Sequence, residues 1–314
     1  MTALPRWEVC ATVKAPADQV LAFAAHYLSL GADRVWLCFD DPDDPAFAAV
    51  EGLRRIRAVR CDAAWWEKGG GQRPDTHQNR QMRNVGRVWR RSDADFVFHA
   101  DADEYLIADR SVAECLADLD PERAILRVEP WEALHDPALP PDIFTARHFR
   151  RALPPQTAAA ILGPYADVLP RGLLSHSAGK CFFRTGVPGL VPNIHGARMG
   201  GERVDGGRFH RDLALLHFHA EDPARWRAAL PFRLTRGAYR FNPPLQAHLS
   251  AASAAGIDAF YTAVQVARPE YLAALAAAGC LRKADLGLAA RVAALRARPR
   301  RVTPPSAPLA ADRR

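Results

Sequence analysis

The stretch His99-Ala100-Asp101-Ala102-Asp103-Glu104 decides the fold, because it places three carboxylates directly after the apolar run Phe96-Val97-Phe98. Short apolar runs of this kind are typical of parallel strands, and ligands of open α/β sheets bind at the carboxyl ends of such strands. Two Asp residues separated by one residue point the same way from an extended backbone, so both can face one hard divalent cation. The motif therefore predicts a site for a cation and a nucleotide diphosphate. Asp is also common in turns, so the surrounding sequence has to distinguish a cation site from an acidic turn.

Apolar runs alternate with helix-like segments from the start of the chain to this motif. Strands are predicted over 8–13, 34–39, 56–61 and 95–99, and helices over 17–30, 46–55 and 75–91. Parallel strands need crossover connections, which helices supply. The pattern predicts an α/β fold with a Rossmann-like, mostly parallel sheet flanked by helices.

The later part of the chain is less regular. Further strands are predicted over 124–129, 180–184 and 213–218, with Pro-rich loops over 130–170. We predict three parts: a nucleotide-sugar-binding and catalytic domain over 1–222, a helical C-terminal region over 223–297 and a disordered basic tail over 298–314.

Composition limits the classes of function. The chain has 314 residues, 49% of them hydrophobic, and a net charge of +7, which suits phosphate-bearing partners: a nucleotide sugar, an anionic lipid surface or nucleic acid. Its six cysteines are scattered without metal-ligand spacing, which fits a reducing cytoplasm. No signal peptide or membrane-spanning segment is expected. We expect a cytoplasmic protein whose basic tail is either solvated without a partner, the favoured alternative, or in peripheral contact with the inner face of the membrane.

Several segments together carry a family resemblance. Lys14 ends the first strand, the run over 25–35 leads into Asp40-Asp41-Pro42-Asp43-Asp44, and the acidic motif continues into Tyr105-Leu106. Over residues 7–240 the chain resembles the bacterial glycosyltransferase family 2-like proteins, which have the GT-A fold. One departure is that Ala15-Pro16 follows Lys14, where the family often has an acidic residue.

The resemblance implies a role for each matching residue. Asp40 or Asp41 would hold the uracil or ribose of a UDP-sugar, and Asp101 and Asp103 would hold a divalent cation, Mn²⁺ or Mg²⁺, with the diphosphate. Glu104 matches the pattern without a settled role. Further donor-binding positions are Lys14, Gln78, Asn79 and Lys180, and further metal positions are His195 and His217.

An inverting transfer also needs a carboxylate that takes the proton of the acceptor hydroxyl. Glu129, Glu132 and Asp136 follow the strand after the acidic motif and are the three candidates, with surface acids as the alternative. The resulting hypothesis is a metal-dependent glycosyltransferase that acts on a glycan or lipid-linked acceptor in the synthesis of cell-surface polysaccharide or glycoconjugate.

Two other classes of function remain open. A catalytically silent nucleotide-sugar-binding protein on the same fold is one, although intact Asp101 and Asp103 speak against it. A nucleic-acid-binding protein is the other, suggested by the charge. The arginine clusters lie on predicted helices with acids beside them, without the interleaved surface aromatics of a nucleic-acid module. We therefore expect no nucleic-acid partner.

Overall fold

A computed structural model describes residues 3–299 of the chain. By contacts, the chain divides into two compact units. Of the described residues, unit 1 comprises 3–129, 179–215 and 287–299, and unit 2 comprises 130–178 and 216–286. The division differs from the predicted boundary at residue 222, because the chain leaves unit 1 and returns to it twice. Most of the predicted tail, residues 300–314, lies outside the described residues.

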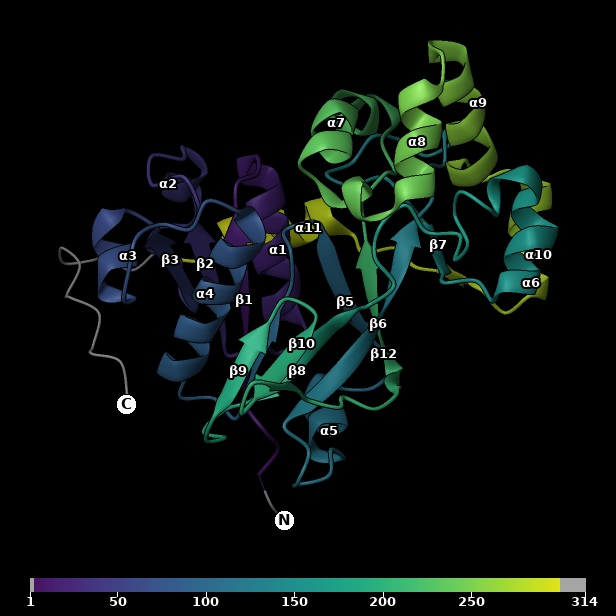
Figure 1. Cartoon of the computed structure of the whole chain (residues 1–314). Helices are drawn as coiled ribbons and strands as arrows, with labels where there is room; N and C mark the ends of the chain where they lie inside the picture. Colours follow the sequence, from purple (N-terminus) through teal and green to yellow (C-terminus); the bar gives the residue numbers. More distant parts are fainter. Residues whose placement is uncertain (1–2, 300–314) are drawn as a thin grey trace. The chain divides into compact units, whose positions relative to one another are not determined.

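The core of unit 1 is a parallel sheet in the order β4-β1-β2-β3 (Figure 1). Its strands are β1 (Trp7–Val13), β2 (Arg34–Phe39), β3 (Ile56–Arg60) and β4 (Phe96–His99). All seven residues of β1 are buried, as expected for a central strand covered on both faces. This arrangement confirms the predicted α/β class.

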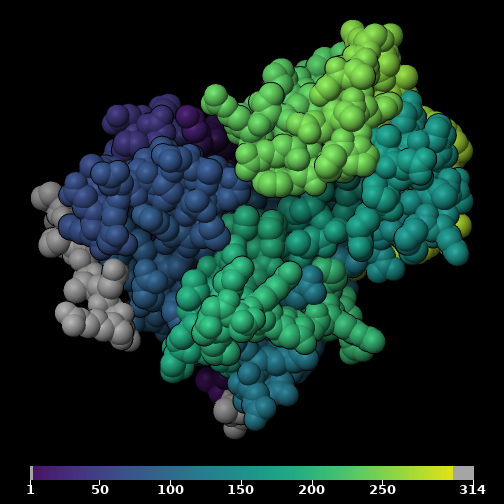
Figure 2. All heavy atoms as spheres, viewed as in Figure 1, coloured from purple at the N-terminus to yellow at the C-terminus, as the bar shows by residue number. Residues whose placement is uncertain are grey.

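Helices cover both faces of this sheet. On one face, Tyr27 of α1 (Ala17–Ser29) packs its ring against Phe98. On the other, Val85 and Val88 of α4 (His77–Arg91) join the core around Cys10. The other helices of unit 1 are α2 (Ala46–Val50), α3 (Ala63–Lys68), α5 (Val112–Ala117) and α11 (Leu288–Arg296), the last of which packs on α1. In the space-filling view, the blue residues of α3 and α4 form a continuous area (Figure 2).

Antiparallel strands extend the sheet beyond β4. The strand β8 (Lys180–Arg184) pairs with β4 and with the first half of β6 (Ile125–Ala133). The strand β5 (Glu104–Ala108) pairs with β12 (Phe209–His217). A separate sheet contains β9 (Leu190–Asn193), β10 (Gly196–Met199) and β11 (Glu202–Arg203).

Unit 2 contains the second half of β6, paired with β7 (His148–Arg151), which pairs with β13 (Leu281–Lys283). Its helices are α6 (Pro155–Leu162), α7 (Pro223–Thr235), α8 (Pro243–Ala251), α9 (Ala254–Gln265) and α10 (Pro269–Ala277), with 3₁₀ turns at Gly163–Tyr165 and Ala238–Phe241. The predicted loop region 130–170 therefore contains β7 and α6. Proline misled the prediction, because Pro155 occupies the first helical position, where a missing N–H is harmless.

Among residues 3–299, none of the helices combines the length and the apolar character that crossing a bilayer requires.

Candidate functional site

A pocket of about 430 Å³ lies at the carboxyl ends of β1, β2 and β3 in unit 1. Lys14 follows β1, Asp40 and Asp41 follow β2, and Cys61 follows β3, and all four line the pocket. Because these strands are parallel, the residues after them meet at one edge of the sheet. The pocket thus forms where the sequence predicts nucleoside contacts.

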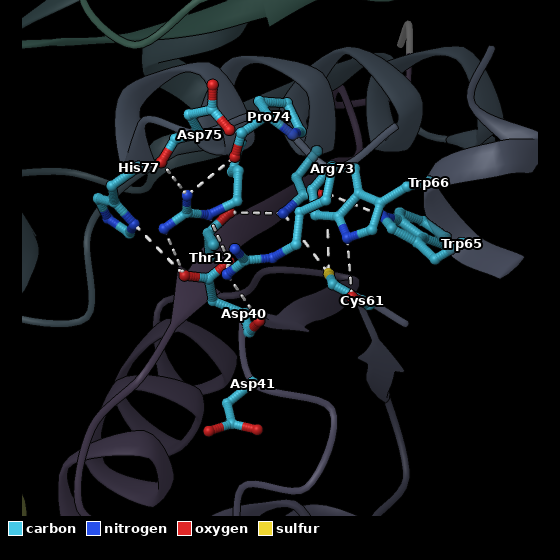
Figure 3. Close-up of polar contacts among 12 residues, drawn as sticks. Thr12, Asp40, Asp41, Cys61, Trp65, Trp66, Arg73, Pro74, Asp75 and His77 are labelled. Atoms are coloured by element: carbon cyan, nitrogen blue, oxygen red, sulfur yellow. Dashed lines mark hydrogen bonds and ion pairs between the residues drawn. The ribbon is translucent and has the colours of Figure 1, made fainter. Parts of the chain in front are cut away.

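The Asp40 carboxylate is held by arginines (Figure 3). Arg80 donates from Nε to Oδ1 at 2.6 Å and from Nη2 to Oδ2 at 2.9 Å, and Arg73 donates to Oδ1 at 3.0 Å. Burial alone would raise the pKa of Asp40, but contacts with His77, Arg80 and Arg73 hold it well below its ordinary value. Asp40 is therefore a charged anchor.

Arg80 also fixes the loop that borders the pocket. Its Nη1 donates to the carbonyl oxygens of Pro74 at 3.0 Å and Asp75 at 2.8 Å. Figure 3 shows the carboxylate of Asp41 pointing away from this cluster, and Asp41 is only partly buried. Of the two predicted nucleoside contacts, Asp41 is thus the carboxylate that a ligand can reach more readily.

Two tryptophans and an asparagine support the wall of the pocket. The helix α3 starts at Asp62, whose side chain accepts the N–H of Trp65. Trp65 donates from Nε1 to Oδ1 of Asn84 at 2.9 Å, and Asn84 donates to Thr12 Oγ1 at 2.9 Å. Trp66, which lines the pocket, donates to the Cys61 carbonyl at 2.8 Å. These bonds satisfy the polar atoms of buried side chains.

The acidic motif forms a second group of charges at the end of β4. Lys180 Nζ lies 2.9 Å from Asp101 Oδ2 and 3.4 Å from Glu104 Oε2. Gln81 donates to Asp101 Oδ1, and Glu104 Oε2 accepts the N–H of Asp101 at 2.8 Å. Glu104 is completely buried, whereas the Asp101 side chain is 29% exposed. Glu104 therefore holds the motif in shape, and Asp101 presents part of its carboxylate to solvent.

Lys180 depends on the glycine before it. Gly179 has a φ of +72°, and a Cβ there would lie 2.1 Å from the Val128 carbonyl oxygen, so only glycine fits. Burial alone would lower the pKa of Lys180, but Asp101 and Glu104 raise it overall. The ammonium therefore stays charged at the first position of β8.

Consecutive residues of α4 link the two groups. Arg80 binds Asp40 and Gln81 binds Asp101, so neighbouring positions of one helix reach the ends of β2 and β4. Gln78 and Asn79, which the sequence analysis favours, are less buried, and the Asn79 N–H bonds to the capping hydroxyl of Thr76. The inward positions follow a helical spacing of three to four residues (77, 80, 81, 84), and that periodicity is the signal that could have identified Gln81, Arg80 and Asn84.

The other predicted metal positions lie in both units. Asp103 belongs to unit 1 and is partly buried. His195, also in unit 1, has its Nδ1 2.8 Å from the Gly179 carbonyl oxygen. His217 lies at the end of β12 in unit 2, with its ring 5.3 Å from that of His176.

The three candidate bases have different surroundings. Glu129 is partly buried on β6 in unit 1. Glu132, in unit 2, is completely buried, pairs with Arg150 at 2.6 Å and accepts the N–H groups of Leu174 and Ser175. These contacts give Glu132 a structural role, and its buried carboxylate is poorly placed to act as a general base. Asp136, also in unit 2, lies 3.4 Å from His148 and is 15% exposed.

The donor atoms at the end of β4 fit a hard divalent cation. Asp101 and Asp103 offer carboxylate oxygens, the ligands that Mn²⁺ and Mg²⁺ prefer. Asp101 Oδ1 accepts a bond from Gln81 and Oδ2 accepts one from Lys180, so a cation would compete with the ammonium for this carboxylate.

No protein-family model and no curated protein matches the sequence. Among solved structures, CMP:2-keto-3-deoxy-manno-octonic acid synthetase complexed with CTP is 17% identical over 40% of this chain and 53% of its own, with a TM-score of 0.27. S. aureus TarS 1-349 is 11% identical over 74% of this chain and 66% of its own, with a TM-score of 0.31. The chain thus spans about half of the first protein and about two thirds of the second. At this level of similarity, neither match identifies a function.

Proposed function

We propose that this chain is a glycosyltransferase that transfers a sugar from a nucleotide-sugar donor, with a UDP-sugar as the preferred donor. The observation that carries the proposal is the α4 link: Arg80 fixes Asp40 beside a pocket of about 430 Å³, and Gln81 contacts the partly exposed Asp101. A pocket beside an acidic, cation-compatible group suits a nucleoside with its diphosphate.

The residues have distinct tasks in this proposal. Asp41 and Lys14 would contact the nucleoside part, since both line the pocket without belonging to the Asp40 cluster. Asp101 and Asp103 would hold Mn²⁺ or Mg²⁺, which neutralises charge on the leaving diphosphate when bound. Lys180 brings a positive charge to the same carboxylate and would stabilise the charge that develops as the sugar–phosphate bond breaks.

The acceptor side of the reaction rests on fewer observations. Glu129 and Asp136 keep partly exposed side chains, so either can take the proton of an acceptor hydroxyl in an inverting transfer. A glycan or a lipid-linked sugar is the proposed acceptor class, and synthesis of cell-surface polysaccharide or glycoconjugate is the proposed setting.

A second candidate is a nucleotide-sugar-binding protein that needs no metal and does not turn over. The ion pair between Lys180 and Asp101 favours it, because the ammonium already supplies a positive charge where the cation would lie. Hydrolysis or transfer of the donor separates the two candidates, since only the enzyme consumes it.

Calorimetric titration with UDP and UDP-sugars, with and without Mn²⁺, tests the proposal. Wild type should bind UDP and UDP-sugars more tightly with Mn²⁺ than without it. A ligand present at a hundredfold its Kd should also add about 2.7 kcal/mol to the free energy of unfolding. Asp101→Asn and Asp103→Asn should lose the Mn²⁺-dependent part. Asp120→Asn, which changes an exposed carboxylate of the same unit, is the matched control. Binding that ignores both Mn²⁺ and the two substitutions would overturn the metal-dependent mechanism.

A further inference from the structure

Three side chains of metal-ligating types lie together in unit 1, and none of the three is a residue of the candidate site. Cys115 comes from α5, and His210 and Asp212 come from β12. One potential ligand atom of each lies within 4.8 Å of those of the other two. Cys115 is completely buried, and the other two are partly buried.

The local fold brings these elements together. The helix α5 starts at Ser111 with a capping box, in which Ser111 and Glu114 exchange side-chain and backbone hydrogen bonds. Just before the helix, the Asp109 N–H donates to the Asp212 carbonyl oxygen at 2.9 Å. The start of α5 is thus attached to the strand that carries the other two ligands.

We propose that Cys115, His210 and Asp212 bind Zn²⁺. A thiolate, an imidazole and a carboxylate are the ligand types that zinc takes, and three protein ligands leave one tetrahedral position for water. The thiolate disfavours Mg²⁺ and Ca²⁺, which prefer oxygen ligands alone. The site differs in this respect from Asp101 and Asp103, which offer only oxygen.

Two of the three groups are in the protonation state that a metal ligand needs, and the thiol is not. Burial lowers the pKa of His210, so the imidazole is neutral near pH 7. A hydrogen bond from Arg110 lowers the pKa of Asp212, which keeps the carboxylate charged. Burial raises the pKa of the Cys115 thiol. Binding therefore requires the thiol proton to leave for solvent while a sulfur lone pair bonds the metal, and each bound ion releases a proton.

Neighbouring contacts set the orientation of two ligands. Arg110 donates from Nε to Asp212 Oδ2 at 2.8 Å, the kind of outer contact that orients a ligating carboxylate. The Asp212 N–H donates to His210 Nδ1 at 3.3 Å, a long and weak bond. The ring can give up this bond or change tautomer at little cost when it binds a metal.

One consequence of such a site concerns the stability of α5. The helix α5 has six residues, too few for intrinsic helical stability. A zinc ion that joins Cys115 to β12 would hold this helix on the sheet.

Cobalt substitution of the full-length chain tests the proposal, because Co²⁺ bound to a thiolate gives a near-ultraviolet charge-transfer band that oxygen ligands do not give. We expect this band to saturate at a single equivalent of Co²⁺, with release of a proton, and to disappear when Zn²⁺ is added. The Asp101 and Asp103 site, which lacks sulfur, cannot produce the band.

Variants locate the metal. Cys115→Ser should abolish the band, and His210→Ala should weaken binding by at least the roughly 10–100-fold that loss of an outer-shell partner costs. Cys280→Ser, which changes another buried cysteine, is the matched control and should keep the band. His210→Ala keeps the test valid if Cys115→Ser does not fold, because its target is partly exposed. Absence of a cobalt–thiolate band in wild type, or its persistence in Cys115→Ser, would overturn the proposal.

Discussion

Two acid–base pairs of this chain have similar geometry and different surroundings. In unit 2, Glu132 and Arg150 lie 2.6 Å apart and are both completely buried. In unit 1, Asp101 and Lys180 lie 2.9 Å apart, with Lys180 1% exposed and Asp101 29% exposed. Arg150 and Lys180 are almost equally buried, so the two pairs differ in how far the carboxylate is exposed.

The exposed fraction of the carboxylate separates a structural pair from one that a ligand can reach. Glu132 accepts bonds from Arg150, Leu174 and Ser175, and Arg150 also donates to Gln265 at 2.8 Å. Such a network pairs the buried guanidinium with a buried carboxylate, and removing either partner leaves the other charge buried without its counterion. The Asp101 carboxylate is partly exposed to solvent, so a cation can reach it.

The largest effect is expected for Glu132→Gln. The substitution leaves the Arg150 guanidinium buried without its counterion, so we expect a loss of about 3–5 kcal/mol in the free energy of unfolding. Urea denaturation measures it. Glu270→Gln, in the exposed pair with Arg268, is the control and should change stability by less than about 1 kcal/mol. Equal losses in the two variants would show that burial of the pair does not determine its contribution to stability.

Lys180→Met tests whether the pair in unit 1 can exchange its cation. The variant leaves Glu104 buried without a counterion, so it should be less stable than wild type. Mn²⁺ at a hundredfold its Kd should then recover about 2.7 kcal/mol, because a bound cation supplies the missing charge. Arg150→Met, in which the pair is fully buried, should gain no more from Mn²⁺ than wild type gains through Asp101 and Asp103. Thermal unfolding with and without Mn²⁺ measures the stability of both variants. Equal recovery would show that the exposure of the carboxylate does not determine whether Mn²⁺ can replace the basic side chain.

Asp40 and Asp41 repeat the comparison on a smaller scale. Asp40 is 6% exposed and bound by Arg80, whereas Asp41 lines the pocket and is partly buried. Asp41→Asn should therefore weaken UDP binding by about 1.5 kcal/mol through loss of a charge-assisted hydrogen bond, with unchanged stability. Asp40→Asn should instead lower the free energy of unfolding. Calorimetry and urea denaturation separate the outcomes, and a reversal of the two would refute the assignment.

The sequence predicts those parts of the molecule that depend on local patterns. The mostly apolar runs that become β1, β2 and β4 predict the central parallel strands, because strands covered on both faces are rich in apolar residues, whereas the outer strand β3 contains two exposed arginines. The placement of the acidic motif at the carboxyl end of β4 also follows from the sequence, because the motif comes directly after Phe96-Val97-Phe98. Whether Asp101, Asp103 and the other candidate residues bind a donor or a metal stays a prediction.

The parts that were missed depend on contacts between distant segments. Arg150 lies on β7, in a region whose proline content predicted loops. The pairing of Glu132 with Arg150 could therefore not be predicted from the residues next to Glu132 in the sequence. Gln81 reaches Asp101 only because α4 turns that face toward the sheet. Gln78 and Asn79 lie only three and two residues before Gln81 but are less buried, because the buried polar positions of α4 include Arg80, Gln81 and Asn84.

The smallest effect is expected in the pH dependence of the stability that Glu132 contributes. Burial alone would raise the pKa of Glu132, but Arg150 and the N–H groups of Ser175 and Leu174 hold it below the ordinary 4.5. The unfolded chain therefore binds this proton more readily, and the stability that Glu132 contributes is present above about pH 5 and is lost as pH falls through the lowered pKa. Each unit of depression is worth about 1.4 kcal/mol. The stability gap between wild type and Glu132→Gln should consequently narrow from pH 7 toward pH 3 in urea denaturation, while the gap for Glu270→Gln stays small throughout. A gap for Glu132→Gln that is constant with pH would mean that its carboxylate is not the charged partner of Arg150.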